Sequence, residues 1–317
     1  MSTHPDLVAA VSRWYEHERR DFPWREPTAT PWGILVSEVM SQQTQMSRVE
    51  PRWRELMQKW PTPAALAAAS DAEVIRAWDR LGYPRRAVAL RRCAEQIVRV
   101  YGGEVPADRD ALMALPGIGH YTSAAVCSFA FGMRVPVVDT NVRRVLTRAV
   151  HGEAVAWRPN AKRDEAEMLA LLPDSGSESQ PWNAGAMELG AVVCTARSPR
   201  CSDCPIRELC QWRGAGYPQL EADEVARRSI RQARFEGSDR QRRGRIMAVL
   251  RKHPGGVEVD QLWSRIQIDT DFVMPRSAEQ LTAERERYLT NATALMAEGL
   301  VAQTDERIHL PGDAPAS

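Results

Sequence analysis

Apolar residues recur at three- and four-residue spacing along the first two thirds of the chain, as on the buried face of a helix. This spacing predicts helices within residues 7–15, 32–60, 72–78, 87–101, 121–131 and 142–150. Proline and glycine interrupt the pattern, as in Gly82-Tyr83-Pro84, and we find no alternation typical of strands there. We therefore expect residues 5 to about 212 to be all-α.

The remainder of the chain reads as an arm followed by a small domain. Between Gly214 and Gly237 the periodicity fades, and this stretch carries the closely spaced Arg227, Arg228, Arg231 and Arg234, which indicate a linker with a basic face. Beyond it, the pattern predicts helices at 244–252, 259–266 and 283–297 and a hairpin from 300–304 and 307–310. Three helices followed by a hairpin is the order of a winged helix. We therefore divide the chain at 1–213, 214–238 and 239–317.

Composition narrows the class of protein only slightly. A chain of 317 residues exceeds what one hydrophobic core usually organises. Its net charge of +1 does not indicate a nucleic-acid partner, but a basic face can be balanced by acidic residues elsewhere. The best apolar stretch, 124–138, is interrupted by Arg134 and Pro136, and the N-terminus lacks the pattern of a signal peptide. We expect a cytoplasmic protein without membrane attachment, and a monomer.

Four of the six cysteines are packed into one short segment with the spacing C-x6-C-x2-C-x5-C. They are Cys194, Cys201, Cys204 and Cys210. Four thiolates this close together can hold zinc or a [4Fe–4S] cluster. Zinc ribbons usually need two C-x2-C pairs roughly 15 or more residues apart, and only one such pair occurs, so the cluster is favoured. We expect it to hold the loop 194–210 structurally, with Arg197 and Arg200 adding positive charge to its surface.

A glycine pair lies between two predicted helices, in Leu115-Pro116-Gly117-Ile118-Gly119. Gly117 and Gly119 allow a tight turn that brings backbone amides to a helix N-terminus, where they can hold a phosphate oxygen. This is the form of a helix–hairpin–helix, which grips a DNA backbone independently of sequence. A plain connection between two helices is the alternative.

Two carboxylates occupy positions suited to acid–base chemistry. Glu38 lies within the apolar run 34–40, where it is either at a solvated margin or desolvated. Desolvation would raise its pKa and let it act as a general acid near neutrality. Asp139 follows the apolar run 135–138 as the expected N-cap of the next helix, whose amides would keep it ionised. A protonated Glu with an ionised Asp is the pair that breaks a glycosidic bond.

Together these motifs resemble the adenine DNA glycosylases of the MutY family. The resemblance covers residues 7 to about 212 and rests on several motifs in one order. The matching segments are Phe22-Pro23-Trp24-Arg25, residues 37–45, Leu81-Gly82-Tyr83, residues 115–122, residues 138–146 and Met187-Glu188-Leu189-Gly190-Ala191.

The resemblance implies a two-lobed helix–hairpin–helix fold, with the active site between the lobes and a [4Fe–4S] cluster. It also implies excision of adenine opposite 8-oxoguanine or guanine in double-stranded DNA, and hence a nucleoid-associated protein. Glu38 would protonate N7 of adenine, while Asp139 would stabilise the sugar cation or bond to it transiently. Tyr121 and Asn141 would support that intermediate.

Further residues carried over from the resemblance would bind the DNA. Arg25 and Glu188 would contact the extruded adenine, while Gln43 and Tyr83 would enter the duplex beside the damaged guanine. Extrusion of the base is required because N7 and C1′ cannot be reached inside the base stack.

One substitution separates this chain from the related endonuclease III branch, which cleaves the strand through a Schiff base. That branch carries Lys where this chain has Tyr121, and no Lys lies between Lys59 and Lys162. Because a lyase needs an amine nucleophile, we expect a glycosylase without efficient strand cleavage. The alternatives are an endonuclease III-like glycosylase for another base and a non-catalytic iron–sulfur DNA-binding regulator. The Glu38/Asp139 pair argues against the regulator.

The chain also departs from the family pattern. Ser41 stands where Leu is frequent, and Pro84 stands where a second Tyr is common. Many family members have a Nudix-like C-terminal domain with a Phe-Ser-His loop that reads 8-oxoguanine, and no such loop is found here. Recognition of 8-oxoguanine must therefore come from the catalytic domain or from the different tail, or be weaker.

Overall fold

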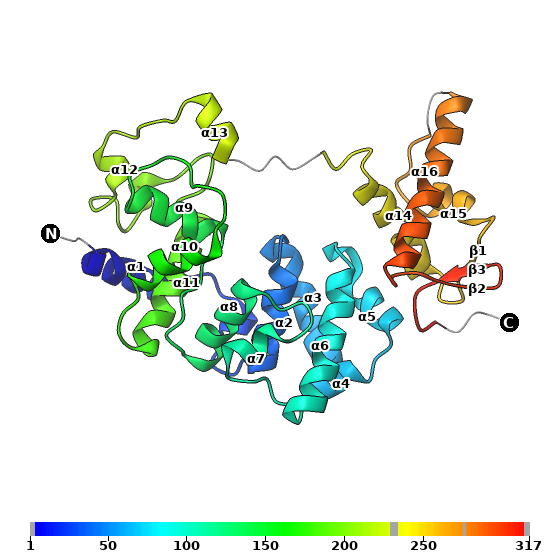
Figure 1. Ribbon diagram of the computed structural model, residues 1–317, viewed down its shortest axis with the longest axis horizontal. Helices are drawn as coiled ribbons and strands as arrows, with labels where there is room; N and C mark the ends of the chain where they lie inside the picture. The colour runs from blue at the N-terminus through cyan, green and yellow to red at the C-terminus, as the bar shows by residue number, and fades with distance from the viewer. Residues whose placement is uncertain (1–3, 229–233, 275–276, 314–317) are drawn as a thin grey trace. The chain divides into compact units, whose positions relative to one another are not determined.

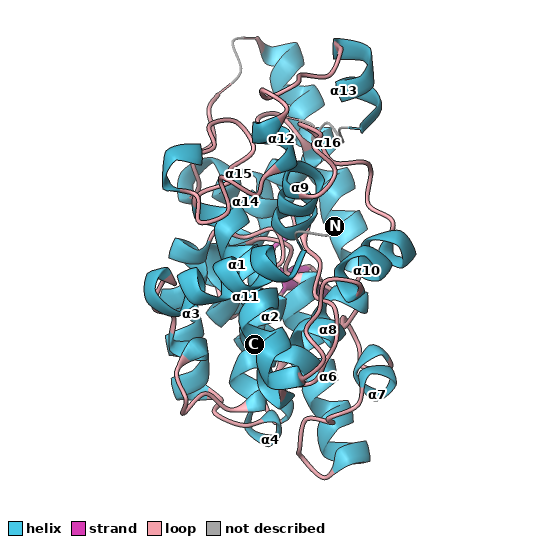
Figure 2. Cartoon of the chain, turned by 90° about the vertical axis from the view of Figure 1, so that its left-hand side faces the viewer, coloured by secondary structure: helices cyan, strands magenta, loops and turns pink. Residues whose placement is uncertain are grey.

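The protein is described here by a computed structural model covering residues 4–228, 234–274 and 277–313 (Figure 1). Helices dominate, and Figure 2 shows how little strand accompanies them. The first part of the chain contains α1 (His4–Glu18), α2 (Pro31–Ser41), α3 (Met46–Lys59), α4 (Pro63–Ala67), α5 (Asp71–Trp78), α6 (Arg85–Tyr101), α7 (Arg109–Met113), α8 (His120–Phe131), α9 (Thr140–Ala149), α10 (Ala161–Leu169), α11 (Gly176–Val192) and α12 (Gln211–Gly214). The all-α prediction for this region is confirmed.

Two features of this helical region differ from the expected pattern. The apolar run 32–60 forms two helices, because the polar segment 42–44 turns the chain and places Gln43 at φ 54°. The long helix α11 was not predicted individually, since Pro181 and three small residues obscure its spacing.

The chain folds into two compact units, one comprising Met1–Glu38 and Val105–Arg231 and the other Val39–Glu104 and Gln232–Ser317. In the first unit, α1 and α9 both pack on α11 around a core that includes Val11, Val145 and Trp182. A Cβ added to Gly190 of α11 would lie 2.7 Å from Cβ of Asn141. Only glycine therefore lets α11 approach the start of α9 this closely.

The second unit contains a continuous core formed by two distant stretches of sequence. Ala72 and Ile75 of α5 belong to the same apolar cluster as Ile246, Leu250 and Leu295 near the C-terminus. The later elements of this unit are α14 (Asp239–Lys252), β1 (Val257–Glu258), α15 (Leu262–Asp269), α16 (Ala278–Ala297), β2 (Ala302–Thr304) and β3 (Arg307–His309). The C-terminal segment therefore packs as one body with the helices of 39–104.

The C-terminal elements follow the order of a winged helix, as predicted. The hairpin β2–β3 pairs Gln303 with Ile308, and β1 joins the other edge of β3 by pairing Val257 with Ile308. Strand β1 was not predicted because two residues are too few to show alternation. Ser238 and Ser277 cap α14 and α16 and set the starts of these helices.

Part of the basic arm folds into α13 (Ala222–Arg228). Arg228 does not contribute to the expected basic face, because its buried guanidinium donates hydrogen bonds to Glu153, Glu224 and the carbonyl of Val155. Arg234 is exposed, whereas Arg231 lies outside the described residues. No helix in the described part of the chain is long and apolar enough to span a membrane.

Candidate active site and iron–sulfur loop

Glu38 lies on α2 and is desolvated, with only 9% of its surface exposed. Burial is the main cause that raises its pKa, to about 7. A hydrogen bond from Tyr121 and the charge of Arg25 oppose the shift, while the charge of Asp139 adds to it. The structure thus selects the desolvated placement, and the Glu38 carboxyl can hold a proton near neutral pH.

Tyr121, in the first turn of α8, supplies the hydrogen bond to Glu38. Burial first, and then the neighbouring carboxylates, raise the pKa of Tyr121 well above its usual value. The Tyr121 hydroxyl therefore stays protonated and can donate a hydrogen bond to the Glu38 carboxyl. The same hydroxyl lies 3.8 Å from Sδ of Met187 on α11.

Asp139 caps α9, as the sequence predicts. Its Oδ1 accepts a hydrogen bond from the Val142 amide at 2.7 Å, and its Oδ2 accepts one from Nδ2 of Asn141 at 2.7 Å. The capping bonds and the charge of Arg144 lower the pKa of Asp139, as expected, but burial outweighs them and the net pKa is raised. The site therefore contains two carboxyls whose pKa values are both raised.

Arg144, which sequence reasoning missed, connects the Asp139 cap to the cysteine loop. Its guanidinium donates hydrogen bonds to Oδ1 of Asn141 at 2.8 Å and to the carbonyls of Gly190 at 2.6 Å and Cys194 at 2.7 Å. The signal in the sequence was weak, since an arginine in an amphipathic helix is usually solvated.

Glu188 on α11 is almost completely buried, with 1% of its side chain exposed. Burial alone would raise its pKa, but hydrogen bonds and charges from Arg20 and Arg25 outweigh burial and lower the pKa. Nε of Arg20 lies 2.5 Å from Oε1, and Nη2 of Arg25 lies 2.9 Å from Oε2. Glu188 and Arg25 are thus brought together as a pair, and Arg20 is an additional partner that was not predicted.

The glycine hairpin connects α7 to α8, with Ile118 buried beneath it. Gly117 has φ 77°, which strongly favours glycine, so the expected tight turn depends on this residue. Gly119 is extended, with φ −106°, so the turn itself does not require glycine there. Nothing lies within 4 Å of a Cβ added to Gly119, which is exposed immediately before α8.

In the second unit, Arg86 joins the loops that contain Gln43 and Tyr83. Its guanidinium donates hydrogen bonds to the carbonyls of Gln42 and Gly82, among others. Burial lowers the pKa of Arg86 to about 10, so it remains charged at neutral pH. Tyr83 has φ 49° and is 42% exposed. Arg86 was missed because its acceptors lie far apart in the sequence.

The two departures from the family pattern flank these loops. Pro84 lies immediately before α6 with φ −59°, a backbone angle already suited to starting a helix. Ser41 ends α2, and its hydroxyl lies 3.8 Å from Sδ of Met46.

The four clustered cysteines line one hollow together with Ile206 and Trp212. Burial, together with the neighbouring thiols, raises the pKa of Cys204 to about 12. Buried Arg148 donates to Sγ of Cys194 at 3.4 Å and to the carbonyl of Thr195 at 2.7 Å. Four cysteines that line one hollow beside a guanidinium fit a bound [4Fe–4S] cluster, whose thiolate ligands carry negative charge.

The arginines of the cysteine loop are exposed, as expected. The guanidinium of Arg200 donates to the carbonyl of Val192 at 2.9 Å, although 59% of its side chain remains exposed. Arg197 is also exposed.

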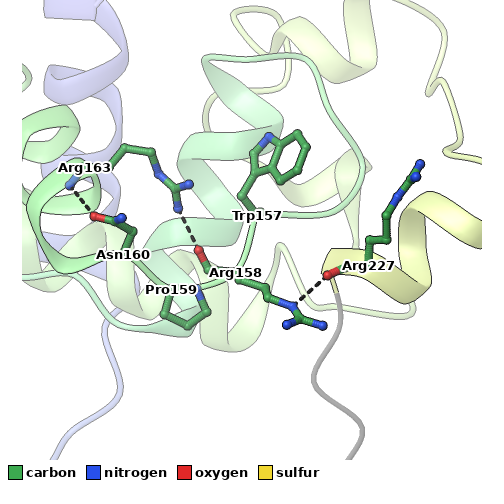
Figure 3. Close-up of a pocket in the computed structure, with 6 residues that line it drawn as sticks. All are labelled: Trp157, Arg158, Pro159, Asn160, Arg163 and Arg227. Atoms are coloured by element: carbon green, nitrogen blue, oxygen red, sulfur yellow. Dashed lines mark hydrogen bonds between the residues drawn. The ribbon is translucent and has the colours of Figure 1, made fainter.

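A separate hollow of about 470 Å³ lies where α13 meets the loop before α10 (Figure 3). Trp157, Arg158, Pro159, Asn160, Arg163 and Arg227 line it. Nε of Arg158 donates to the carbonyl of Arg227 at 2.7 Å, and Arg163 donates to the carbonyl of Arg158 at 2.9 Å. The hydrogen bond from Arg158 to Arg227 holds α13 against the rest of the first unit.

Comparison with known protein families agrees with this geometry. Residues 36–170 match the HhH-GPD superfamily of base excision DNA repair proteins, and residues 194–210 match the iron-sulfur binding domain of endonuclease III.

Solved structures agree as well. A thermostable thymine-DNA glycosylase has a TM-score of 0.60 at 28% identity, covering 67% of this chain and 97% of the other. A trapped endonuclease III–DNA covalent intermediate has a TM-score of 0.58 at 26% identity, covering 69% and 100%. The fold and the cysteine loop thus define a helix–hairpin–helix base-excision glycosylase with a [4Fe–4S] cluster.

Curated relatives narrow the class further. Adenine DNA glycosylase of Mycobacterium tuberculosis is 48% identical over 301 residues, covering 95% of this chain and 92% of the relative. The Mycolicibacterium smegmatis enzyme of the same name is 50% identical, covering 95% and 94%. The human enzyme is 40% identical over 210 residues, covering 63% and 38%. The chain belongs to the adenine DNA glycosylase family.

Proposed function

We propose that this protein excises adenine opposite 8-oxoguanine or guanine in double-stranded DNA, by hydrolysing the N-glycosidic bond without efficient strand cleavage. The observation that carries the proposal is the buried Glu38, whose pKa is raised to about 7 beside the capped Asp139. Relatives named adenine DNA glycosylase, which align with 95% of the chain, support the choice of base.

In the proposed reaction, Glu38 donates its proton to N7 of the extruded adenine. The bond between C1′ and N9 then breaks, and its electron pair leaves with the base. Asp139 stabilises the resulting oxocarbenium ion or bonds to C1′ transiently. Water finally adds to C1′ and returns a proton to the Glu38 carboxylate, which restores the starting state.

The two carboxyls need different charges for this reaction. Asp139 accepts hydrogen bonds from Val142 and Asn141 and lies near the charge of Arg144, and all three favour its ionised form. Glu38 is desolvated by burial, and both this burial and the nearby Asp139 charge favour its protonated form. We infer that the single proton of the pair resides on Glu38 and that the negative charge resides on Asp139. Tyr121 and Asn141 would hold the two carboxyls in place.

The proposed DNA contacts rest on the family resemblance and, at the glycine hairpin and the cysteine loop, on exposed amides and charges. We propose that Arg25 and Glu188 contact the extruded adenine, and that amides at Gly117 and Gly119 bind a backbone phosphate. Arg197 and Arg200 would add positive charge at the cysteine loop, while Gln43 and Tyr83 would enter the duplex. We further propose that the protein acts on DNA as a monomer at the nucleoid.

We keep the division of the chain into 1–213, 214–238 and 239–317 as a proposal about function. The first segment would carry the chemistry, and the second would connect it to the tail. The tail aligns with the mycobacterial relatives, whereas the alignment with the human enzyme covers only 63% of the chain. The winged-helix-like segment is thus shared with the mycobacterial relatives, and we propose that it assists the catalytic segment.

We infer the lack of efficient lyase activity from the side chain at position 121. A Schiff base requires an amine, whereas Tyr121 offers a hydroxyl whose pKa is raised well above its usual value. Because that hydroxyl is protonated and hydrogen-bonded to Glu38, it is a poor nucleophile.

A second candidate is excision of another base. A Pyrobaculum aerophilum protein named thymine/uracil-DNA glycosylase is 35% identical over 200 residues, covering 62% of this chain and 86% of the relative. We favour adenine because the adenine-named mycobacterial relatives are 48% and 50% identical over far more of the chain.

The test is single-turnover cleavage of labelled duplexes, with and without hot alkali. The duplexes contain adenine opposite 8-oxoguanine, guanine or thymine, thymine opposite guanine, and thymine glycol opposite adenine. Alkali-dependent breaks at adenine opposite 8-oxoguanine and guanine are expected. Breaks at thymine opposite guanine would support the second candidate, and alkali-independent breaks at thymine glycol would place the activity with endonuclease III.

A further inference from the structure

The exposed Tyr83 is contacted by the C-terminal domain. Nη1 of Arg240, in the first turn of α14, donates a hydrogen bond to the Tyr83 hydroxyl at 3.3 Å. The guanidinium of Arg86 lies 5.5 Å from the centre of the Tyr83 ring. Tyr83 is therefore held by one arginine from its own helical region and by another from the tail.

The position of α14 relative to the Tyr83 loop is set by packing within the second unit. Ile75 and Val88 share one apolar core with Ile246 and Leu250 of α14. The backbone amide of Ala72 also donates to the carbonyl of Pro311 at 2.8 Å. Because this core is continuous, α14 and the loop are parts of one folded body.

Charged contacts strengthen the same junction next to Tyr83. Glu298 at the end of α16 accepts hydrogen bonds from Arg243 of α14 and from Arg85, which begins α6. Hydrogen bonds from Arg243 and Arg85 lower the pKa of Glu298 to about 2, so this carboxylate stays ionised at neutral pH. Arg85 follows Tyr83 by two residues, so this bridge fixes the tail directly beside the loop.

Arg240 also lies over a second exposed aromatic side chain. Its guanidinium carbon is 5.1 Å from the centre of the Phe235 ring, and Phe235 is 53% exposed. Within the described residues, no ion pair joins Arg240 to a carboxylate. Tyr83, Phe235 and Arg240 thus form a group of two exposed aromatic rings and one half-buried cation, which we call the aromatic corner. Such groups suit unstacked bases and the phosphates that join them.

We propose that the aromatic corner contacts the DNA strand opposite the excised base, and that Arg240 is the residue that positions Tyr83 for this contact. The proposal rests on the proposed function, in which Tyr83 enters the duplex. It gives the tail a defined role, which is to link binding of the opposing purine to the helical region through one side chain.

A double-mutant cycle tests this role. Tyr83→Phe removes the hydroxyl that Arg240 contacts but keeps the ring, and Arg240→Ala removes the cation. Each variant is expected to weaken binding to an A:8-oxoguanine duplex about fivefold, the size of the one hydrogen bond that both changes remove. The double variant should be little worse than Arg240→Ala, because both changes break the same contact. Additive losses would overturn the positioning role.

A matched control and a direct readout separate positioning from general charge or folding. Arg285→Ala removes an exposed arginine of the C-terminal domain, on α16, and should leave binding unchanged. With 2-aminopurine beside the opposing base, Arg240→Ala should reduce the fluorescence increase on binding, while thermal melting stays that of the parent. If Arg240→Ala matches Arg285→Ala in both assays, the inference fails.

The outcomes also separate this inference from the proposed function. If the parent protein releases no adenine from either mispair, the proposed function fails. If the parent releases adenine and Arg240→Ala binds and unstacks the duplex normally, only the role of Arg240 is overturned. The Tyr83→Ala variant, which removes the ring, should lose more binding than either single change.

Discussion

Two buried glutamates in the first unit have opposite acid–base behaviour. Glu38 is 9% exposed and its pKa is raised to about 7, whereas Glu188 is 1% exposed and its pKa is lowered. Taken alone, burial would raise the pKa of both side chains. The difference lies in the partners, since Glu188 has two arginines in direct contact and Glu38 has one hydroxyl. Burial therefore does not decide protonation until the neighbouring charges are counted.

The two glutamates share Arg25, which gives each a distinct task. Arg25 is hydrogen-bonded to Glu188, and its charge acts on Glu38 only at a distance. Glu188 thus fixes the position of a cation that tunes Glu38 without neutralising it. In this arrangement Glu188, which we call the anchor, holds Arg25 in place, and the Glu38 carboxyl remains available as a proton donor.

Among the substitutions that test this comparison, Glu38→Gln should have the largest effect, and the effect is on catalysis. Glu38→Gln removes the proton donor, and general acid catalysis contributes roughly 10²–10⁴-fold to a rate. We expect single-turnover adenine release to fall about 1,000-fold, with binding of the mismatched duplex retained. Glu16→Gln, at an exposed position of α1, is the control and should react like the parent. Near-normal release by Glu38→Gln would exclude Glu38 as the acid.

The next effect concerns the stability of the anchor. Glu188→Gln leaves Arg20 and Arg25 without their carboxylate, and breaking a buried ion pair costs about 3–5 kcal/mol. Because Arg20 is 40% exposed, we expect the lower end, about 3 kcal/mol, in urea unfolding at pH 7. Glu208 also pairs with two arginines, Arg207 and Arg213, but is 66% exposed. Glu208→Gln should cost less than about 1 kcal/mol, and equal losses would contradict the comparison.

The third expected effect is a gain in stability rather than a loss. Folded Glu38 keeps its proton up to about pH 7, whereas in the unfolded chain it ionises near its ordinary pKa of 4.5. Stability is therefore lost as pH rises between these values, and Glu38→Gln avoids this loss. We expect the variant to match the parent near pH 4 and to exceed it at pH 8 by up to about 3 kcal/mol.

The anchor should show the reverse dependence on pH. The lowered pKa of Glu188 adds stability that is present above its unfolded value and lost as pH falls through its folded value. The deficit of Glu188→Gln should therefore shrink in acid, while the advantage of Glu38→Gln grows in alkali. Parallel curves for the two variants in urea unfolding would show that the two sites do not differ.

The sequence predicted the chemical identity of these sites better than their electrostatics. The motif order identified Glu38, Asp139 and Glu188, but the apolar run around Glu38 was compatible with both a solvated and a buried side chain. The cap on Asp139 and its lowering effect on the pKa were predicted correctly, whereas the larger effect of burial was not, because burial depends on helices that are distant in sequence. Local pattern indicates which residue caps a helix, but not how much water remains around it.

Three half-buried arginines also show what the sequence pattern does not predict. Arg20, Arg86 and Arg144 bind carbonyls or carboxylates up to 168 residues away, and none was predicted. Their periodicity is that of ordinary surface positions, so only the folded chain reveals their acceptors. By contrast, helices such as α6 and α9 followed directly from apolar spacing, and the two-residue strand β1 was too short to be detected.

The smallest expected effect is a shift of the Glu38 pKa in Tyr121→Phe, which should leave Glu188 and its arginines undisturbed. Tyr121→Phe removes the one hydrogen bond that lowers the pKa of Glu38 and leaves the Arg20–Glu188–Arg25 contacts in place. The Glu38 pKa should then rise, so the alkaline limb of the single-turnover pH–rate profile moves to higher pH by a fraction of a pH unit. Arg25→Gln should move the limb in the same direction but also lower stability, because Arg25 is shared with Glu188. A limb that stays in place in Tyr121→Phe, or moves to lower pH, would mean that the proton measured by the profile is not held by Glu38.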